Sequence, residues 1–412
     1  MGGSIAGCAA AVAVQRAGHT VTVFERSRAD LAERGLGIVI PPALREKLVS
    51  AGYVDAAMPV CTASERVWVV RRPGRREGRE LWRQPSPIAA CNWALLWQSL
   101  RRRVSDGDYR RADRVAEVHA AIPERPSSAS KAEVHTDRGQ DLTCDMVVGA
   151  DGYGSLVRGT VFPRVRPSFA GYALWRASLP LRQVPDGARI RNELSGKYYT
   201  IVFPGGHAVL YLIPGSQGDA QETLRLNWAL YAVPPTDMAF DATMSYPPGR
   251  VAEALVRHAQ GLIEESFPDP WRDAVLATGA DAVTVQPVHD LSLPRVARAP
   301  FLLAGDASTI TRPHTASGAV KALQDALLLE QVLRSSPSLS AALAAYDEDR
   351  RAVGNQLVSL GRALGQAQVE DTPDWQTMSP QKMAAWTLAT LNGKSHYLYE
   401  EKELMEPTHY RE

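Results

Sequence analysis

The chain has 412 residues, of which 45% are hydrophobic and 22% are charged, and its formal net charge is +1. This composition is ordinary for a globular protein with more than one core, and the near-neutral charge argues against nucleic acid or an anionic membrane as a partner. The four cysteines are widely spaced and form no CxxC motif, so we predict no disulfide framework and no metal site, in a reducing, cytoplasmic setting. No apolar run approaches the roughly 18 residues of a membrane span.

The first motif is the glycine-rich string GGSIAG at residues 2–7, followed by an Ala- and Val-rich, helix-like segment that ends near Gly18. Residues 20–24 (TVTVF) read as a strand, and Glu25 stands at its end. This is the dinucleotide pattern G-x-G-x-x-G with Ser4 at the second glycine, plus an acidic residue about 20 positions on that can hold a ribose hydroxyl. The glycines let the turn approach a pyrophosphate, and the helix N-terminus stabilises its charge.

A buried strand should precede this motif, and here only Met1 does. In a parallel sheet that strand would be central, and its neighbours would lack backbone partners without it. We therefore expect the true reading frame to begin several codons upstream. Expressing the chain with and without those codons tests this; equal solubility and cofactor content would contradict it.

Residues 71–85 (RRPGRREGRELWRQP) contain six arginines. We interpret them as a solvated hairpin turn around Pro73-Gly74, because single-strand nucleic-acid binders interleave aromatic residues through a basic groove. Residues 41–51 and 92–104 are helix-like, and the second of these helices carries Gln98 and three arginines at 101–103 that could reach cofactor phosphates.

Two further motifs each follow an apolar run. Residues 146–150 read as a buried strand that ends in Asp151-Gly152, with Ser155 and Arg158 one helical turn apart. Residues 301–304 read as a strand that ends in Gly305-Asp306, followed by a Gly-, Pro- and Ser/Thr-containing loop and a helix over 319–333. Such a loop presents backbone N–H groups to an anionic or carbonyl-rich ligand. Taken alone, each motif is also an ordinary turn.

The stretch 165–290 alternates in short apolar segments separated by Gly/Pro turns, which predicts an antiparallel sheet. Its aromatic residues include Trp175, Tyr198, Tyr199, Tyr211, Trp228 and Tyr231. An aromatic residue on a sheet is more often part of the core than a ligand contact. A helix is predicted over 341–369, followed by a polar, Pro-interrupted tail with some helical content.

GGSIAG with Glu25, GADGYGSLVR at 149–158 and the Gly-Asp stretch from 305 stand in a defined order, with the sheet between the second and third. In this combination the chain resembles the FAD-dependent aromatic hydroxylases of the para-hydroxybenzoate hydroxylase fold, the class A flavoprotein monooxygenases. The resemblance covers nearly the whole chain. FAGYALWR at 169–176, RLNW at 225–228 and GDASTITRPHTASGAVKA from 305 are similar to the 2,6-dihydroxypyridine 3-monooxygenase branch.

The resemblance implies an α/β fold with a Rossmann-like FAD-binding domain, its first strand absent from this sequence, an inserted antiparallel-sheet substrate domain and C-terminal helices. We assign residues 1–65, 91–164 and 286–335 to the FAD-binding domain, 66–90 and 165–285 to the substrate sheet, and 336–412 to the helical region. FAD is the implied cofactor and NAD(P)H the implied co-substrate. A homodimer is a family expectation.

The resemblance also implies roles for individual residues. Glu25 would bind the adenosine ribose and Asp306 the ribityl chain of FAD. The complete set of predicted cofactor-binding residues is Gly2, Ser4, Gly7, Glu25, Arg26, Gln98, Asp151, Gly152, Arg158, Gly305, Asp306, Ala316, Ser317 and Gly318. The predicted catalytic or substrate-contacting residues are His314, Pro313, Tyr211, His207 and Arg176. Two positions depart from the family pattern, because Thr309 replaces a usual histidine and Gln98 replaces a common arginine.

The implied reaction uses NAD(P)H to reduce FAD and O2 to form a flavin hydroperoxide, whose distal oxygen is attacked by an electron-rich hydroxypyridine or phenol ring. A base or hydrogen-bond acceptor is expected near the ring hydroxyl. The predicted partners are therefore a small aromatic substrate and O2. Two alternatives stay open: a tailoring oxygenase for a larger polycyclic natural product, and a non-catalytic remnant of the flavin fold. The string WRASLP at 175–180 does not match the WxWxIP motif of halogenases.

Overall fold

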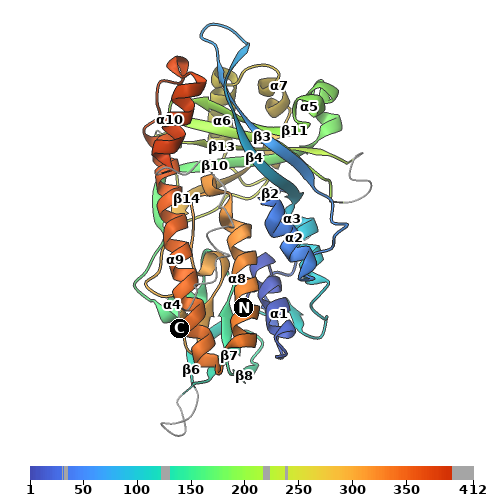
Figure 1. Ribbon diagram of the computed structural model, residues 1–412, viewed down its shortest axis with the longest axis vertical. Coiled ribbons are helices and arrows are strands. Elements are labelled where there is room, and N and C mark those ends of the chain that lie inside the picture. Colours follow the sequence, from blue (N-terminus) through green and yellow to red (C-terminus); the bar gives the residue numbers. More distant parts are fainter. Residues whose placement is uncertain (30, 32–35, 122–129, 217–222, 237–239, 392–412) are drawn as a thin grey trace, which may run out of the picture.

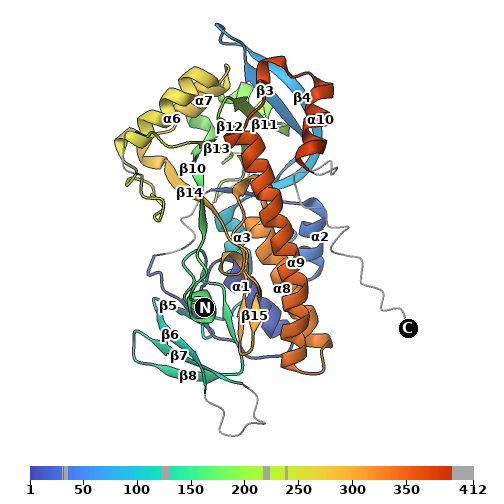
Figure 2. The same cartoon turned by 90° about the vertical axis from the view of Figure 1, so that its left-hand side faces the viewer.

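The computed structural model describes residues 1–29, 31, 36–121, 130–216, 223–236 and 240–391. One end of the molecule is a large sheet with helices on its faces, and the other end is a layer of short strands with helices around α1 (Ile5–Arg16) and α8 (Ser317–Ser335) (Figure 1). The long helix α9 (Leu339–Gly365) runs along α8 toward the large sheet (Figures 1 and 2). The chain thus has a mixed α/β architecture with C-terminal helices, as predicted.

The strands that precede the motifs form two short parallel pairs. β1 (Val23–Glu25) pairs with β5 (Tyr109–Arg111), and β9 (Val147–Gly149) pairs with β16 (Phe301–Leu303), whose other edge carries β15 (Ala297–Arg298). All residues of β1 and β16 are buried. The strands predicted over residues 20–24, 146–150 and 301–304 therefore form as β1, β9 and β16, each shorter than predicted.

Met1 and Gly2 lie between these two strand pairs. The Met1 ammonium donates to the Val148 carbonyl at 2.7 Å, and the Met1 carbonyl accepts from the Ala150 N–H at 2.9 Å. The Gly2 N–H donates to the Phe24 carbonyl at 2.9 Å. These bonds connect the edge of β1 to the edge of β9, so the glycine motif is fixed between the two strands.

Small side chains bring the helices of this region close together. Helix α1 is mostly alanine and valine, nine of its residues are buried, and it packs against α8. The remaining elements of this region are α2 (Pro42–Ser50), α3 (Trp93–Arg101), α4 (Leu156–Val161), β6 (Val115–Ala120), β7 (Ala132–Thr136) and β8 (Asp141–Cys144). Strands β6, β7 and β8 form a separate antiparallel sheet.

The large sheet has eight strands in the order β14-β10-β13-β12-β11-β3-β4-β2. Its neighbouring strands are antiparallel, except that β11 runs parallel to β3. The strands are β2 (Gly37–Ile40), β3 (Cys61–Arg71), β4 (Gly78–Asn92), β10 (Ser168–Pro180), β11 (Gly196–Phe203), β12 (Gly206–Ile213), β13 (Arg225–Ala232) and β14 (Thr284–Asp290). Strands β3 and β4 form the hairpin predicted around Pro73-Gly74, and the antiparallel sheet predicted for 165–290 is present.

The two faces of this sheet differ in chemistry because side chains alternate along each strand. One face buries apolar residues such as Trp175, Leu210 and Trp228 beneath three helices. Those helices are α5 (Gly187–Glu193), α6 (Glu253–Ser266) and α7 (Trp271–Leu276) (Figure 1). The other face carries Arg176 and Tyr211 and contacts the first region.

The C-terminal segment covers part of that polar face. Helix α9 continues into a π-helical turn, η6 (Gln366–Glu370), and α10 (Pro380–Thr390) lies beside β3 and β4 (Figure 2). Trp68 of β3 packs against Trp375 and Trp386, with ring centroids 6.5 and 5.8 Å away. The short 3-10 helices are η2 (Leu181–Gln183), η3 (Ala280–Ala282), η4 (Gly305–Ala307), η5 (Pro313–Thr315) and η7 (Trp375–Thr377).

The sheet takes in a segment that the sequence analysis had grouped with the FAD-binding domain. Strand β2 pairs with the end of β4, although it lies within residues 1–65. Strand β3 likewise begins at Cys61 rather than at residue 66. The proposed domain boundaries otherwise stay a prediction.

Candidate active site

The glycine motif leaves the start of α1 open. Gly2 has φ +88°, and a Cβ on Gly7 would lie 1.7 Å from the Gly2 carbonyl oxygen, so neither position accommodates a side chain. Ser4 is the N-cap of α1, but its side chain makes no capping hydrogen bond. The first N–H groups of the helix therefore stay available for an anion, as the motif predicts.

Glu25 binds the backbone of the glycine motif. Its carboxylate accepts hydrogen bonds from the N–H groups of Gly3 and Ser27, each at 2.7 Å, and its side chain is buried. It also lines a cavity of about 280 Å³. The neighbouring Arg26 is exposed and does not line this cavity. The full lining is Glu25, Ala29, Leu31, Trp97, Arg101, Asp106, Tyr109 and Arg111.

Helix α3 contributes to this cavity through Arg101, one of the three arginines predicted to reach cofactor phosphates, and through Trp97, for which no role was predicted. Trp97 and Arg101 line the cavity, whereas Gln98 points to another side of the same helix and is half-buried. The Trp97 Nε1–H and the Tyr109 hydroxyl donate to the Gly3 carbonyl at 2.8 and 3.0 Å. Helical spacing could have identified Trp97 and Arg101 together, since residues four apart share a face.

Asp151 organises the start of α4. Its carboxylate accepts from the Ser155 hydroxyl at 2.5 Å and from the Leu156 N–H at 2.7 Å. Gly152 follows with φ +76° and with open space where a Cβ would stand. The carboxylate thus holds the turn, and the glycine leaves room beside it for a ligand.

Arg158 brings the second and third motifs together. It is 5% exposed, and its Nη1 donates to the backbone carbonyls of Asp306 and Ala307 at 3.2 and 3.1 Å. Its Nη2 donates to the Tyr153 carbonyl. Burial lowers the pKa of the guanidinium. Because these donors are bonded to backbone carbonyls, Arg158 acts on the two turns, and the carboxylate of Asp306, 53% exposed, is left open to solvent.

The loop after the Gly-Asp motif ends at a second helix N-terminus. Pro313 starts the short helix η5, and Ala316 has φ +52°, a left-handed conformation that redirects the chain into α8. The N-cap of α8 is Ala316, which has no side chain that could cap the helix. The hydroxyl of Ser317, the first residue of the helix, is hydrogen-bonded to the Thr315 hydroxyl at 2.6 Å. With Gly318 exposed, this helix start can present N–H groups to a carbonyl-rich ligand.

His314 lies where this loop meets the polar face of the large sheet. Its Nε2 is 2.6 Å from the Tyr172 hydroxyl, and its Nδ1 has no hydrogen-bond partner among the described residues. Burial, followed by the positive charge of Arg312, lowers the pKa of His314 to about 3. The imidazole is therefore neutral at physiological pH and cannot act there as a cationic acid.

His207 belongs to the same aromatic cluster but is sealed inside it. Its ring stacks on Tyr231 with centroids 4.6 Å apart, and the ring of His314 lies 5.1 Å away. His207 is 1% exposed, and burial holds its pKa well below the ordinary value. In this conformation His207 supports the wall of the cluster, and its role toward substrate stays a prediction.

Arg176 and Tyr211 lie further along the same face, near β2. Arg176 Nη2 donates to the Gly37 carbonyl at 3.0 Å, and its Nε has no partner within the described parts of the chain. The Gly37 N–H donates to Asn227 Oδ1 at 2.7 Å. A Cβ on Gly37 would approach both Asn227 and Tyr211 to 2.8 Å. Asn227, part of the RLNW string, is thus a residue of this face that the sequence analysis quoted but gave no role.

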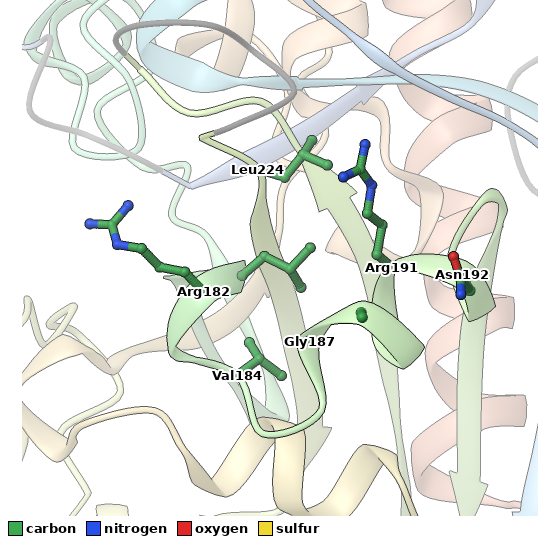
Figure 3. A pocket seen from close by; sticks show the side chains of 8 residues that line it. Arg182, Val184, Gly187, Arg191, Asn192 and Leu224 are labelled. Atoms are coloured by element: carbon green, nitrogen blue, oxygen red, sulfur yellow. The ribbon is translucent and has the colours of Figure 1, made fainter.

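A larger cavity, of about 570 Å³, lies elsewhere, on the helix-covered side of the sheet between η2, α5 and the start of β13. Figure 3 shows Arg182 and Arg191 on its two sides. None of the predicted site residues lines it. Its lining is Leu181, Arg182, Val184, Gly187, Ala188, Arg191, Asn192 and Leu224.

Comparison with known proteins shows the family of the chain. Residues 1–360 match the model of the family described as FAD binding domain. The chain belongs to this family. The enzyme is 28% identical over 362 residues to a 2,6-dihydroxypyridine 3-monooxygenase of Paenarthrobacter nicotinovorans, covering 84% of this chain and 85% of that protein. It is 26% identical over 382 residues to a salicylate hydroxylase of Pseudomonas putida, covering 85% and 81%.

Solved structures of flavoproteins have the same fold as this chain. The enzyme superposes on 2,6-dihydroxypyridine-3-hydroxylase from Arthrobacter nicotinovorans with a TM-score of 0.78 and 25% identity, covering 92% of this chain and 94% of that one. Klebsiella pneumoniae HpxO in complex with FAD and uric acid gives 0.72 at 19% identity, covering 98% and 93%, and shows the same fold. The predicted class A flavoprotein fold and the FAD-dependent monooxygenase class are confirmed.

The residues present fit FAD. The open start of α1 and the space at Gly152 suit a pyrophosphate, and the cavity beside Glu25 suits an adenosine. The exposed carboxylate of Asp306 suits a ribityl hydroxyl. Among the described residues, no helix is long and apolar enough to cross a membrane, and no group of three His, Cys, Asp or Glu side chains could hold a metal ion.

Proposed function

We propose that the enzyme hydroxylates a small, electron-rich hydroxypyridine or phenol ring, using NAD(P)H and O2. The observation that carries this proposal is the meeting of the Gly-Asp loop with the polar face of the sheet, through the bond between Tyr172 and His314. This contact unites the segment predicted to lie against the flavin with the segment predicted to hold substrate. The relatives named above, which act on hydroxypyridine and salicylate, support the same ring class.

The charge on this face supports a hydroxylated substrate. Arg66 and Arg176 place two guanidinium groups on it, and Arg66 is held there by the Thr200 hydroxyl at 2.7 Å. A phenol or hydroxypyridine becomes a better nucleophile as its proton leaves, and a nearby cation stabilises the resulting oxyanion. We therefore assign Arg176 to substrate orientation, together with the cross-strand partners Tyr211 and Asn227, which both lie against Gly37 of β2.

His314, His207 and Tyr231 would orient the reacting groups and exclude water from them. FAD, when bound, would supply the oxygen-transfer chemistry. His314 is a neutral hydrogen-bonding group at the loop, and its unpaired Nδ1 is the atom we assign to contact with the reacting groups. The stacked pair of His207 and Tyr231 forms the dry wall behind it.

The test is an absorption spectrum of the purified protein, followed by NADH or NADPH oxidation with a panel of hydroxylated pyridines and phenols. A bound-flavin spectrum and ring-dependent oxidation with stoichiometric hydroxylated product are expected. Oxidation that responds only to large polycyclic phenols would support the tailoring alternative instead. A protein that stays colourless with excess FAD would contradict the proposal and restore the non-catalytic remnant.

Two expectations on setting belong with this proposal. We propose a homodimer, on family grounds, and sedimentation velocity tests it. We also propose a reducing, cytoplasmic setting, because the four cysteines are all free thiols. Growth of the source cells and fractionation with a specific antibody would test the second.

A further inference from the structure

We propose that Lys321, a buried lysine of α8, is a positioning residue for the flavin site: it holds the Gly305–Asp306 turn by its backbone carbonyls and so fixes the direction of the Asp306 carboxylate. Lys321 belongs to the string GDASTITRPHTASGAVKA that starts at residue 305, but the resemblance assigned it no role. The inference rests on FAD binding, and it holds whichever ring the enzyme oxidises.

The contacts of Lys321 are confined to this turn. Its side chain is 2% exposed, and its Nζ donates to the carbonyls of Gly305 and Thr309 at 2.5 and 2.7 Å. The same Nζ lies 3.9 Å from Asp306 Oδ1. One ammonium thus binds the first and last carbonyls of the turn and attracts the carboxylate between them, so the turn is closed around a cation.

Asp325, one helical turn further along α8, completes the clamp. Its Oδ2 accepts from the Gly305 N–H at 2.8 Å, so both polar groups of Gly305 are held by charged side chains four residues apart on one helix. Gly305 has φ +61°, and a Cβ there would lie 2.8 Å from the Cβ of Ala6. The turn is therefore packed against α1 and clamped by α8, and it has little freedom to move.

Arg158 acts on the same turn through the carbonyls of Asp306 and Ala307. Four carbonyls of residues 305–309 therefore accept hydrogen bonds from two buried cations. Because a trans peptide points its N–H opposite to its C=O, the N–H of Asp306 points away from Lys321 and the N–H of Ala307 points away from Arg158. The turn then offers these N–H groups and one exposed carboxylate to a ligand, the donor and acceptor set that a polyhydroxyl chain needs.

The burial of Lys321 needs compensation, because an isolated buried ammonium is costly. Burial lowers its pKa, while the charges of Asp306 and Asp325 act in the opposite direction. Arg350 is the other cation of this network, 3.7 Å from Asp325 and paired with Asp349. The geometry that Lys321 imposes on the turn, by binding the carbonyls of Gly305 and Thr309, explains a buried cation at this position.

The experiment measures the Kd of FAD for the apoprotein by flavin fluorescence, alongside thermal unfolding of the apoprotein. Lys321→Met removes the ammonium and keeps the side-chain length, and Lys321→Gln keeps one neutral donor. Arg334→Met, on the same helix and 58% exposed, is the matched control. We expect Lys321→Met to raise the Kd about tenfold or more, Lys321→Gln to raise it less, and Arg334→Met to leave it unchanged.

A double-mutant cycle separates positioning from general destabilisation. If Lys321 acts through Asp306, Lys321→Met added to Asp306→Asn raises the Kd little beyond Asp306→Asn alone. The proposal would be overturned if the fold-increase in Kd of the double variant equalled the product of the two single fold-increases. It would also be overturned if Lys321→Met raised the Kd no more than Arg334→Met does. Should Lys321→Met not fold, Lys321→Gln decides: a wild-type Kd would show that the charge is not required and would also overturn it. Hydroxylation is not a readout here, so a wrong substrate assignment does not affect the result.

Discussion

The hydroxyl of Tyr172 lies 2.6 Å from Nε2 of His314, and these two residues are 142 positions apart in the chain. The bond fixes the imidazole ring, and Nδ1 finds no hydrogen-bond partner in the part of the chain that the structure describes. The positive charge of Arg312 opposes the rise in the pKa of Tyr172 that burial causes. The orientation of His314 is thus set by its neighbours before any ligand binds.

Tyr172→Phe should therefore free the imidazole of His314 while leaving the aromatic packing intact. We expect a modest loss in the free energy of unfolding, about 1 kcal/mol, and a lower ratio of hydroxylated product to NAD(P)H consumed. The Kd of FAD should not change. Tyr246→Phe removes a hydroxyl bonded near Asp241 at the surface and serves as the control. Unchanged coupling in Tyr172→Phe would remove His314 orientation from the mechanism.

The pKa of His314 predicts how stability depends on pH. Burial lowers the pKa of His314 in the folded protein to about 3, against an ordinary value of 6.5, so between these two values the unfolded chain binds the extra proton and the folded chain does not. Stability from this group is complete above pH 6.5 and falls as the pH drops, by about 1.4 kcal/mol per pH unit. His314→Gln should lose stability less steeply between pH 6.5 and 5 in urea titrations. His19→Gln, at an exposed site, should follow the wild type; equal slopes for all three proteins would refute the prediction.

The close packing of the glycine motif predicts the cost of a methyl group. Gly7→Ala would place a Cβ 1.7 Å from the Gly2 oxygen, so the turn must shift and the approach to the pyrophosphate is lost. We expect a loss of about 1 to 3 kcal/mol in the free energy of unfolding and a sharply weaker affinity for FAD. Gly159→Ala, on α4 with open space around its Cβ, is the control. Wild-type flavin content in purified Gly7→Ala would contradict this.

Glu25 carries a second prediction for cofactor binding. Its carboxylate accepts from two backbone N–H groups, and a glutamine could accept one of them only, with its NH2 group facing the other donor. Glu25→Gln should cost about 1 to 3 kcal/mol of stability and raise the Kd of FAD. Glu46→Gln, exposed on α2, is the comparison. Differential scanning fluorimetry with and without FAD measures both effects, and equal shifts for the two variants would argue against it.

Features that depend on local chemistry could be predicted from the sequence. The sequence showed three kinds of local feature: apolar runs of strand length, the carboxylate that follows each run, and the glycines of the motifs. Gly2, Gly152 and Gly305 have positive φ in the structure. These features could be predicted because they depend on residues near one another in the chain. Their fixed order gave the FAD fold and the enzyme class. The Ala- and Val-rich segment after the glycine motif likewise indicated a helix, which forms as α1.

Only the tertiary structure decided which side chains serve each motif. Arg158 reaches the carbonyl of Asp306 across 148 positions, and Lys321 and Asp325 clamp a turn that lies before their own helix. Trp97 and Arg101, rather than Gln98, line the cavity beside Glu25. Such contacts are set by the packing of whole helices and strands, which no local pattern encodes. The sequence by itself therefore determined the cofactor and the fold, and the packing determined how the Asp306 turn and His314 are held.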